Sequence, residues 1–494
     1  MKRNLITETP VAGLSKVVGC PTSSTGDIMA PDSDEDDWTK YADTGYESNY
    51  DPWADLVSTN EEVDDFEEDI DEFVDDDIGP REIPRCPTPD GIEHAIKIGT
   101  CDYCLGRVSG VRIGGDPLEE VGARVRKEAS ERDSDIKPND DVDCCPFCED
   151  LFMELDLIAE RIISAVEGVE FQKVQIGIHF AKDHVAAEEV LRTTVAATGS
   201  RPLKASLSDA VQNAVSKRLP GISWVKEGPE VMILFDTLTL GVNADIRALF
   251  LYGRYRKLER GIPQTRWPCR ACRGRDGGCE SCKGTGQQYP DSVQSLVCEP
   301  LVSALGASSD SFHGMGREDI DVRCLGSGRP FVAELKSPVR RNPDFDDLVK
   351  QINELAEGKI EIDRLRFSNK PEVARIKETK AEKSYTIRFS SDHDLSSEEI
   401  EKRINNLSGQ TLEQQTPQRV AHRRADKVRK RKVIEIEEII VDGKEIQFDV
   451  RCESGTYVKE LVHSDEGRTT PSVAGLLEAD CEVLWLDVKD IHAD

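Results

Sequence analysis

The 494-residue chain lacks any run of roughly 18 apolar residues, the length that a membrane-spanning helix needs. Its N-terminus also lacks the apolar core of a secretory signal peptide. No glycine-rich loop stands between a predicted strand and a predicted helix in the pattern that binds nucleotide cofactors. These absences argue against a membrane protein, a secreted protein and a cofactor-dependent enzyme such as a methyltransferase. They predict a protein of the cytoplasm.

The chain also has fewer basic residues than acidic ones, 64 against 95, and the net charge is −31. Residues 1–80 hold 23 acidic residues against 4 basic ones. A segment of this composition cannot bury enough apolar surface to order itself, so we interpret residues 1–80 as a disordered acidic tail. The rest of the chain is too long for one core, which predicts two or more domains. Its acidic balance argues against a broad basic face and is compatible with a protein kept soluble in concentrated salt.

Fifteen cysteines in a reducing compartment suggest metal ligands rather than disulfides. Eight of them form two groups of paired Cys-x2-Cys sequences. The groups are Cys101, Cys104, Cys145 and Cys148, and Cys269, Cys272, Cys279 and Cys282. Four thiolates suit tetrahedral zinc, and a site closed by four cysteines leaves no open position for chemistry. We therefore expect two structural zinc ions, with unligated reduced cysteines as the alternative.

The region between the two cysteine groups has a mixed pattern. Residues 151–166 carry apolar residues at helical spacing, and residues 174–180 alternate as a strand does. Ser206 fits the N-cap of a further helix, and residues 231–235 fit a buried strand. This order indicates a small α/β accessory domain.

The last third of the chain is rich in β-forming residues. They gather in residues 331–335, 385–389, 433–441 and 445–452. Asp442-Gly443 fits a two-residue hairpin turn, and a helix is expected over residues 456–461. Antiparallel strands with few helices predict an α+β catalytic domain. The predicted division is a tail at 1–80, an accessory domain at 81–240 and a catalytic domain at 241–494, with a zinc-binding insert at 266–288.

One segment carries the strongest chemical signal. In residues 316–323, the carboxylates Asp319 and Asp321 alternate with two aliphatic residues. In a strand this alternation would bring both carboxylates to one face. Arg317 and Arg323 are close enough in sequence to hold an acid ionised or to grip phosphate. A charged carboxylate in a cleft is a candidate nucleophile or base, whereas the alternative is an ordinary amphipathic strand with a solvated face.

Residues 419–432 carry a net positive charge, in contrast to the acidic chain as a whole. Eight basic residues, including Arg423, Arg424, Arg429 and Arg431, stand against Asp426 alone. Such a reversal within an acidic protein favours contact with the phosphates of a nucleic acid over a merely solvated face.

Several of these segments together resemble the archaeal and eukaryotic tRNA pseudouridine synthases that act on the TΨC arm. The resemblance rests on residues 316–323, 328–331, 415–426, 455–461 and 467–473, and runs from about residue 95 to the C-terminus. It implies an antiparallel-sheet catalytic domain that follows a THUMP-like RNA-binding accessory domain. It also implies the conversion of uridine to pseudouridine at tRNA positions 54 and 55, without a cofactor.

The resemblance also assigns roles to single residues. Asp319 matches the nucleophile, and Tyr385 matches the aromatic residue that stacks on the target base. Tyr457 matches a second substrate contact, and Lys459 occupies the basic position that pairs with the catalytic aspartate. From the residues alone, Tyr385 could equally pack in a core, Lys459 could be solvated, and Asp321 is the main rival for the nucleophile.

A non-catalytic zinc-containing RNA-binding or chaperone-like protein is the main rival function. It would account for the cysteine groups but would leave Asp319, Tyr385 and Lys459 unexplained. A second rival, another RNA-modifying enzyme with a similar accessory domain, would need the cofactor loop that the chain lacks.

Overall fold

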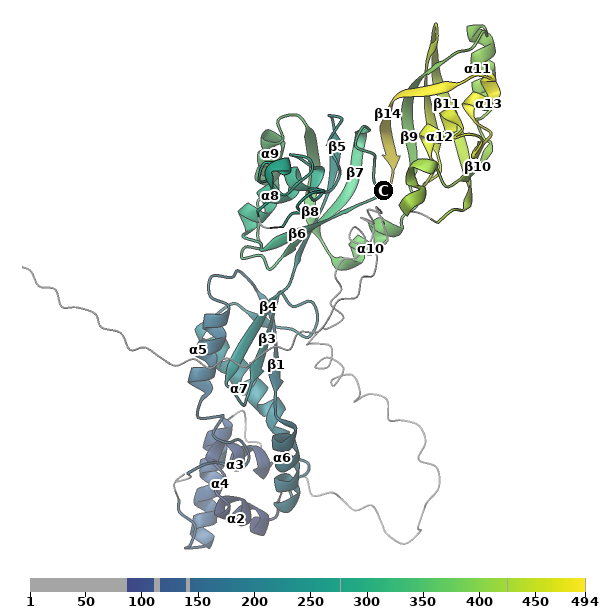
Figure 1. Cartoon of the computed structure of the whole chain (residues 1–494). Coiled ribbons are helices and arrows are strands. Elements are labelled where there is room, and N and C mark those ends of the chain that lie inside the picture. Colours follow the sequence, from purple (N-terminus) through teal and green to yellow (C-terminus); the bar gives the residue numbers. More distant parts are fainter. Residues whose placement is uncertain (1–86, 111–115, 139–142, 276, 424, 494) are drawn as a thin grey trace, which may run out of the picture. The chain divides into compact units, whose positions relative to one another are not determined.

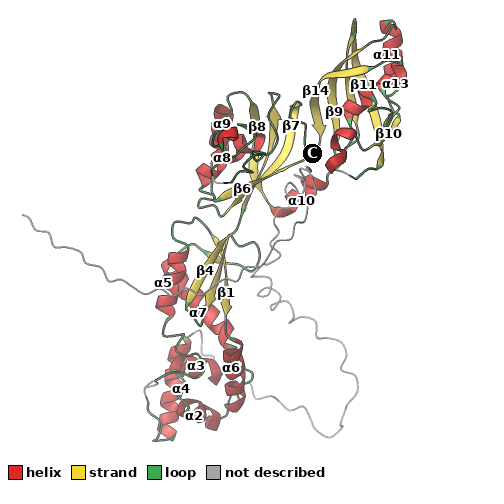
Figure 2. Ribbon diagram, in the orientation of Figure 1, coloured by secondary structure: helices red, strands yellow, loops and turns green. Residues whose placement is uncertain are grey.

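The computed structural model describes residues 87–493, except for residues 111–115, 139–142, 276 and 424 (Figure 1). The acidic tail predicted at residues 1–80 therefore lies outside the described residues. Helices and strands of the described part are organised around two β-sheets, one in each half of the chain (Figure 2). Within that part, no helix has both the length and the apolar character needed to cross a membrane.

The first half contains a group of helices followed by a four-stranded sheet. Its elements are α2 (Pro89–Lys97), α3 (Asp102–Ser109), α4 (Leu118–Arg132), α5 (Leu155–Ala165), β1 (Lys173–His179), α6 (Lys182–Thr194), α7 (Leu203–Arg218), β2 (Ser223–Trp224), β3 (Val231–Asp236) and β4 (Gly241–Ile246). The strand order is β2-β1-β3-β4. β1 runs parallel to β2 and β3, whereas β4 runs antiparallel to β3. Because β4 ends at Ile246, this sheet extends past residue 240, where the sequence analysis set the domain boundary.

One predicted helix start in this half is wrong. The helix expected to begin at Ser206 begins at Leu203, with Pro202 in the N-cap position. Proline suits the start of a helix because the first turn has no use for its missing N–H. Ser206 consequently lies buried inside α7, while the strands predicted at residues 174–180 and 231–235 correspond to β1 and β3.

The second half is built on a ten-stranded sheet of order β13-β10-β11-β12-β9-β14-β7-β5-β8, with β6 paired to β7. Its elements are β5 (Leu249–Lys257), η3 (Glu280–Cys282), α8 (Val293–Leu305), β6 (Ser309–Gly314), β7 (Arg323–Lys336), α9 (Phe345–Leu355), β8 (Ile360–Ser368), α10 (Lys370–Glu378), β9 (Glu382–Ser391), α11 (Ser397–Asn405), β10 (Thr411–Gln415), η4 (Gln418–Arg423), β11 (Val428–Asp442), β12 (Glu445–Cys452), α12 (Val458–His463), β13 (Thr469–Thr470), α13 (Val473–Leu477) and β14 (Cys481–His492). The named strand pairs are antiparallel except for a short parallel contact between β7 and β14. This contact joins the two halves of the sheet.

Each half of the large sheet has its own apolar core. Strands β5 to β8 enclose one core with α8 and α9, which includes Phe331 and Leu301. Strands β9 to β14 enclose the other with α11, α12 and α13, which includes Phe389 and Leu461. The second of these cores also includes Tyr252 of β5 and Val332 of β7, so it continues across the junction of β7 with β14. This junction can therefore present side chains from both parts of the sheet.

The hairpin predicted in the last third is present, with a shift of one residue. Asp442 and Glu445 form the last strand pair, so Gly443 and Lys444 make the turn. Gly443 has a φ of +60°, the left-handed conformation that two-residue hairpin turns require. The helix expected over residues 456–461 begins two residues later, at Val458.

Candidate active site

The segment that carries Asp319 is a loop between β6 and β7, so the strand predicted there is wrong. Residues 315–322 have no strand pairing, and the Val322 N–H donates to the Asp319 carbonyl at 3.1 Å. β7 begins only at Arg323, directly opposite Asp487 of β14. The loop therefore ends where the two halves of the sheet meet, and it presents both carboxylates at that junction.

Asp319 and Asp321 face cations that come from the C-terminal half of the sheet. Asp319 Oδ2 lies 2.9 Å from Arg419 Nη1 and 3.5 Å from Lys459 Nζ. Lys459 Nζ lies 2.8 Å from Asp321 Oδ2. The side chain of Asp319 is 35% exposed and that of Asp321 is 66% exposed, so Asp319 is the more enclosed of the two.

The two carboxylates share the Lys459 ammonium. Partial burial raises the pKa of Asp321, but the hydrogen bond and positive charge of Lys459 outweigh it and hold that pKa below its ordinary value. Asp321 is consequently charged at neutral pH and neutralises part of the Lys459 charge. Arg419 supplies a second cation to Asp319.

Arg419 is held in place by a buried glutamate. It lies on η4, and its Nε donates to Glu460 Oε1 at 2.6 Å. The Glu460 side chain is only 1% exposed and follows Lys459 directly on α12. The first turn of α12 thus contributes to the site twice, through Lys459 and through the orientation of Arg419. In the sequence, Arg419 is recognisable only as part of the basic run and of the motif at residues 415–426, and neither indicates its contact with Asp319.

Tyr457 stands at the N-cap of α12 beside these groups. The Gln414 side chain accepts from its N–H and donates to its carbonyl, both at 2.9 Å. The Tyr457 hydroxyl is buried and has no hydrogen-bond partner among the described residues. Tyr385 lies on β9 between Val450 of β12 and Val488 of β14, where burial raises its pKa above the ordinary value.

Comparison with known proteins shows the family to which the chain belongs. Residues 250–492 match a family model described as Pus10, C-terminal, and residues 158–236 match one described as Pus10 THUMP domain, archaeal. The protein named tRNA pseudouridine synthase Pus10 from Methanothrix thermoacetophila is 36% identical over 446 residues, which cover 83% of this chain and 97% of the relative. The chain belongs to the Pus10 family.

Two further Pus10 relatives carry the same name. The one from Halorubrum lacusprofundi is 38% identical over 401 residues, covering 80% of this chain and 93% of its own. The one from Methanocaldococcus jannaschii is 36% identical over 350 residues, covering 70% and 75%. Membership confirms the predicted α+β fold with a THUMP domain and the predicted enzyme class, an isomerase that acts as a pseudouridine synthase.

In this Pus10 family member, the structure shows partners for only some of the arginines to which the sequence assigned a role. Arg323 pairs with Asp487 at 2.6 Å, and the Arg317 guanidinium lies 5.3 Å from the centre of the Trp267 ring. Arg323 therefore holds an acid, but this acid is Asp487 of β14 and neither of the two loop carboxylates. Arg424 and the side chain of Arg423 lie outside the described residues, so their phosphate contacts stay a prediction.

Both cysteine groups have the donor set for zinc. The four Sγ atoms of each group lie within 4.8 Å of one another. In the first group all four cysteines are buried, and Cys101 caps α3 by accepting from the Cys104 N–H at 3.4 Å. In the second group the N–H groups of Cys279 and Gly286 donate to Cys282 Sγ at 3.1 and 3.2 Å. Such donors suit a thiolate, and both groups could hold a tetrahedral ion.

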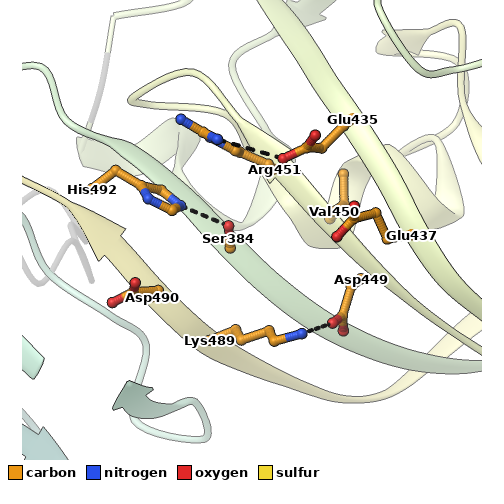
Figure 3. Close-up of a pocket in the computed structure, with 9 residues that line it drawn as sticks. All are labelled: Ser384, Glu435, Glu437, Asp449, Val450, Arg451, Lys489, Asp490 and His492. Carbon is orange, nitrogen blue, oxygen red and sulfur yellow. Dashed lines mark hydrogen bonds and ion pairs between the residues drawn. The ribbon is translucent and has the colours of Figure 1, made fainter. Parts of the chain in front are cut away.

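A pocket of about 240 Å³ lies on the ten-stranded sheet, on the face opposite the one to which Tyr385 points (Figure 3). Ser384 lines it, and because neighbouring side chains of a strand point to opposite faces, Tyr385 points the other way. α12 also packs on the face opposite the pocket, with Phe389 of β9. At the pocket, Lys489 pairs with Asp449 and Arg451 pairs with Glu435. The pocket is therefore separate from the site of Asp319.

Proposed function

We propose that this protein isomerises uridine to pseudouridine at positions 54 and 55 of the tRNA TΨC arm, with Asp319 as the nucleophile and without a cofactor. The observation that carries the proposal is the partly exposed Asp319 carboxylate between Arg419, at 2.9 Å, and Lys459, at 3.5 Å. The names of the relatives support tRNA as the substrate. The proposal includes action in the cytoplasm and a structural zinc ion in each cysteine group.

The reaction suits a carboxylate of this kind. Uracil must leave its ribose, turn, and rejoin through C5, with no net change of oxidation state. A charged carboxylate can add to the sugar or the base, or can remove a sugar proton, and each of these routes needs an accessible oxygen. Two cations fix the orientation of Asp319 while a third of its side chain stays exposed to a bound nucleotide.

The target uridine must leave its stack to reach Asp319. An aromatic face that receives the flipped base contributes about 1–3 kcal/mol. We assign this stacking to Tyr385, as the resemblance implies, and a second contact to Tyr457. The position of Tyr457 supports that assignment, because it is the N-cap of α12 and lies two residues before Lys459.

Asp319 is a better nucleophile candidate than Asp321 on two grounds. Asp319 contacts both Arg419 and Lys459, and it is about half as exposed as Asp321. A reacting group benefits from fixed geometry and partial exclusion of water.

Incubation with an unmodified tRNA transcript tests the proposed activity directly. We expect pseudouridine at positions 54 and 55 by pseudouridine-specific chemical mapping, with no cofactor added. A transcript that is modified at other uridines, with positions 54 and 55 untouched, would contradict the assignment of the substrate site.

The basic run supplies an RNA-binding surface next to this site. Arg429 and Arg431 are half-buried on β11, and the Arg431 guanidinium lies 3.3 Å from the position that a Gly455 Cβ would occupy. Lys430 and Lys432 alternate with them, are exposed, and belong to the other face of the strand. Gly455 lies two residues before Tyr457, the N-cap residue of α12. Because Arg431 is next to Gly455, we infer that Arg429 and Arg431 contact phosphates beside the target uridine.

The double variant Arg429→Gln/Arg431→Gln is expected to weaken tRNA binding and to reduce the salt dependence of log Kd by about two, since each phosphate contact contributes about one. The matched control Lys430→Gln/Lys432→Gln removes the same charge from the other face and should have a smaller effect. Dissociation constants measured over a series of KCl concentrations compare the two. Equal losses in both pairs would contradict a face-specific contact.

A further inference from the structure

Behind the Asp319 loop lies a buried charged cluster that the chemistry proposed above does not use. It consists of Lys257 at the end of β5, Glu318 in the loop, and Arg329 on β7, which we term the buried triad. The side chains of Lys257 and Glu318 are fully buried, and that of Arg329 is 2% exposed. Charges are rarely taken out of water without a structural or functional reason, because their desolvation is costly.

Lys257 binds the backbone of the loop itself. Its Nζ donates to the carbonyls of Ile262 at 2.8 Å, Asp319 at 3.1 Å and Ile320 at 3.3 Å. An ammonium has three N–H donors, and each of these three carbonyls accepts a hydrogen bond from one of them. The nearest oxygen of Glu318 lies 3.8 Å away, so the lysine is attracted to the glutamate but donates to the loop.

Arg329 of the triad and the neighbouring Gln264 bind two further carbonyls of the loop. Arg329 Nε lies 2.8 Å from Glu318 Oε2, and its Nη1 donates to the Met315 carbonyl at 2.7 Å. Gln264 Nε2 donates to the Gly316 carbonyl at 3.0 Å and to the Tyr255 hydroxyl at 2.8 Å. Carbonyls at both ends of the loop therefore accept hydrogen bonds from buried side chains, where strand residues would use a ladder of backbone bonds.

We propose that Lys257 is a positioning residue that fixes the backbone of Asp319 and so aims its carboxylate between Arg419 and Lys459. The inference rests on the proposed role of Asp319 as nucleophile. Hydrogen bonds from a charged donor are shorter and stronger than neutral ones, which suits a loop that must hold one geometry. A displacement of about 1 Å at a reacting group can cost on the order of 100-fold in rate.

The charge balance of the triad makes a specific variant informative. Lys257→Met keeps the length of the side chain and removes its donors, and it leaves Glu318 and Arg329 as a neutral pair. Glu318→Gln instead leaves two buried cations without a carboxylate, which is strongly destabilising. Burial lowers the pKa of Lys257, the opposing charge of Glu318 notwithstanding, and this also favours tolerance of a neutral side chain there.

The test is a single-turnover measurement of pseudouridine formation by the full chain at saturating tRNA. For Lys257→Met we expect the rate to fall on the order of 100-fold, with the dissociation constant for tRNA and the melting temperature close to those of the parent protein. Glu318→Gln should lower the melting temperature. Lys489→Met is the matched control, because Lys489 pairs with Asp449 in the pocket of Figure 3, away from the loop.

The outcomes separate this inference from the proposed function. If Asp319→Asn is inactive and Lys257→Met turns over at the parent rate, the positioning role is refuted and the nucleophile stands. If Asp319→Asn is active, the proposed role of Asp319 as nucleophile fails, and this inference fails with it. If Lys257→Met does not fold, Gln264→Leu is the second variant, because it removes the donor to the Gly316 carbonyl. An unchanged single-turnover rate for Gln264→Leu would refute the inference that buried donors fix the loop of Asp319.

Discussion

Asparagine in place of Asp319 is expected to abolish pseudouridine formation, with a fall in single-turnover rate of roughly 10³-fold or more. The substitution keeps the size of the side chain and removes the charge that the reaction needs. It also leaves the loop hydrogen bonds intact, because these involve the backbone carbonyl of residue 319. The tRNA dissociation constant should stay close to that of the parent protein, since the basic surface of β11 is unchanged. Chemical mapping and binding assays on the same transcript measure both quantities.

Asp321→Asn is the matched control for this variant. The same chemical change is made two residues away, at a carboxylate that shares Lys459 but is 66% exposed. We expect at most about a tenfold loss of rate, because Lys459 is then left to pair with Asp319 alone. Inactivity of Asp321→Asn together with turnover by Asp319→Asn would reverse the assignment of the nucleophile.

The residues of the site could be predicted from the sequence more readily than their geometry. The order of the motifs identified Asp319 and Lys459, and the structure brings these two into contact. The alternation at residues 319–322 suggested a strand because it is a local pattern. Where β7 begins is decided by its partners β5 and β14, which are distant in sequence, and this pairing starts only at Arg323. Alternation alone therefore could not distinguish a strand from a loop that approaches one.

Other parts of the site depend on pairs that no local pattern reveals. Arg419 meets Glu460 across 41 positions of sequence, and Lys257 meets the Asp319 carbonyl across 62. Glu318 has the sequence appearance of a solvated acid, yet it is fully buried because Tyr255 and Arg329 satisfy its oxygens. The hairpin of β11 and β12 and the strands β1 and β3 were predictable because their signals span a few residues. Buried ion pairs were not, because both partners appear polar until the fold encloses them.

Loss of the zinc ion that we propose for the first cysteine group is expected to have the largest effect on stability. Its four cysteines belong to the apolar core of the first half of the chain, which packs α2, α3 and α4 together and continues to β1 and β3 of the four-stranded sheet. Structural zinc sites of this kind contribute on the order of 10–16 kcal/mol to folding. Cys104→Ser, at a fully buried position, should remove one zinc ion and unfold this helical part, seen as an early thermal transition and as protease cleavage within residues 87–150.

The chain offers two matched comparisons for this prediction. Cys144 is exposed and adjoins the first group, so Cys144→Ser should keep both zinc ions and the parent melting curve. Cys272→Ser acts on the second group, which is only partly buried and belongs to an insert outside the two cores of the large sheet. It should remove the other zinc ion and leave the main unfolding transition nearly unchanged. Elemental analysis with calorimetry tests all three variants, and a Cys104→Ser protein that retains both zinc ions would contradict the assignment of the first site.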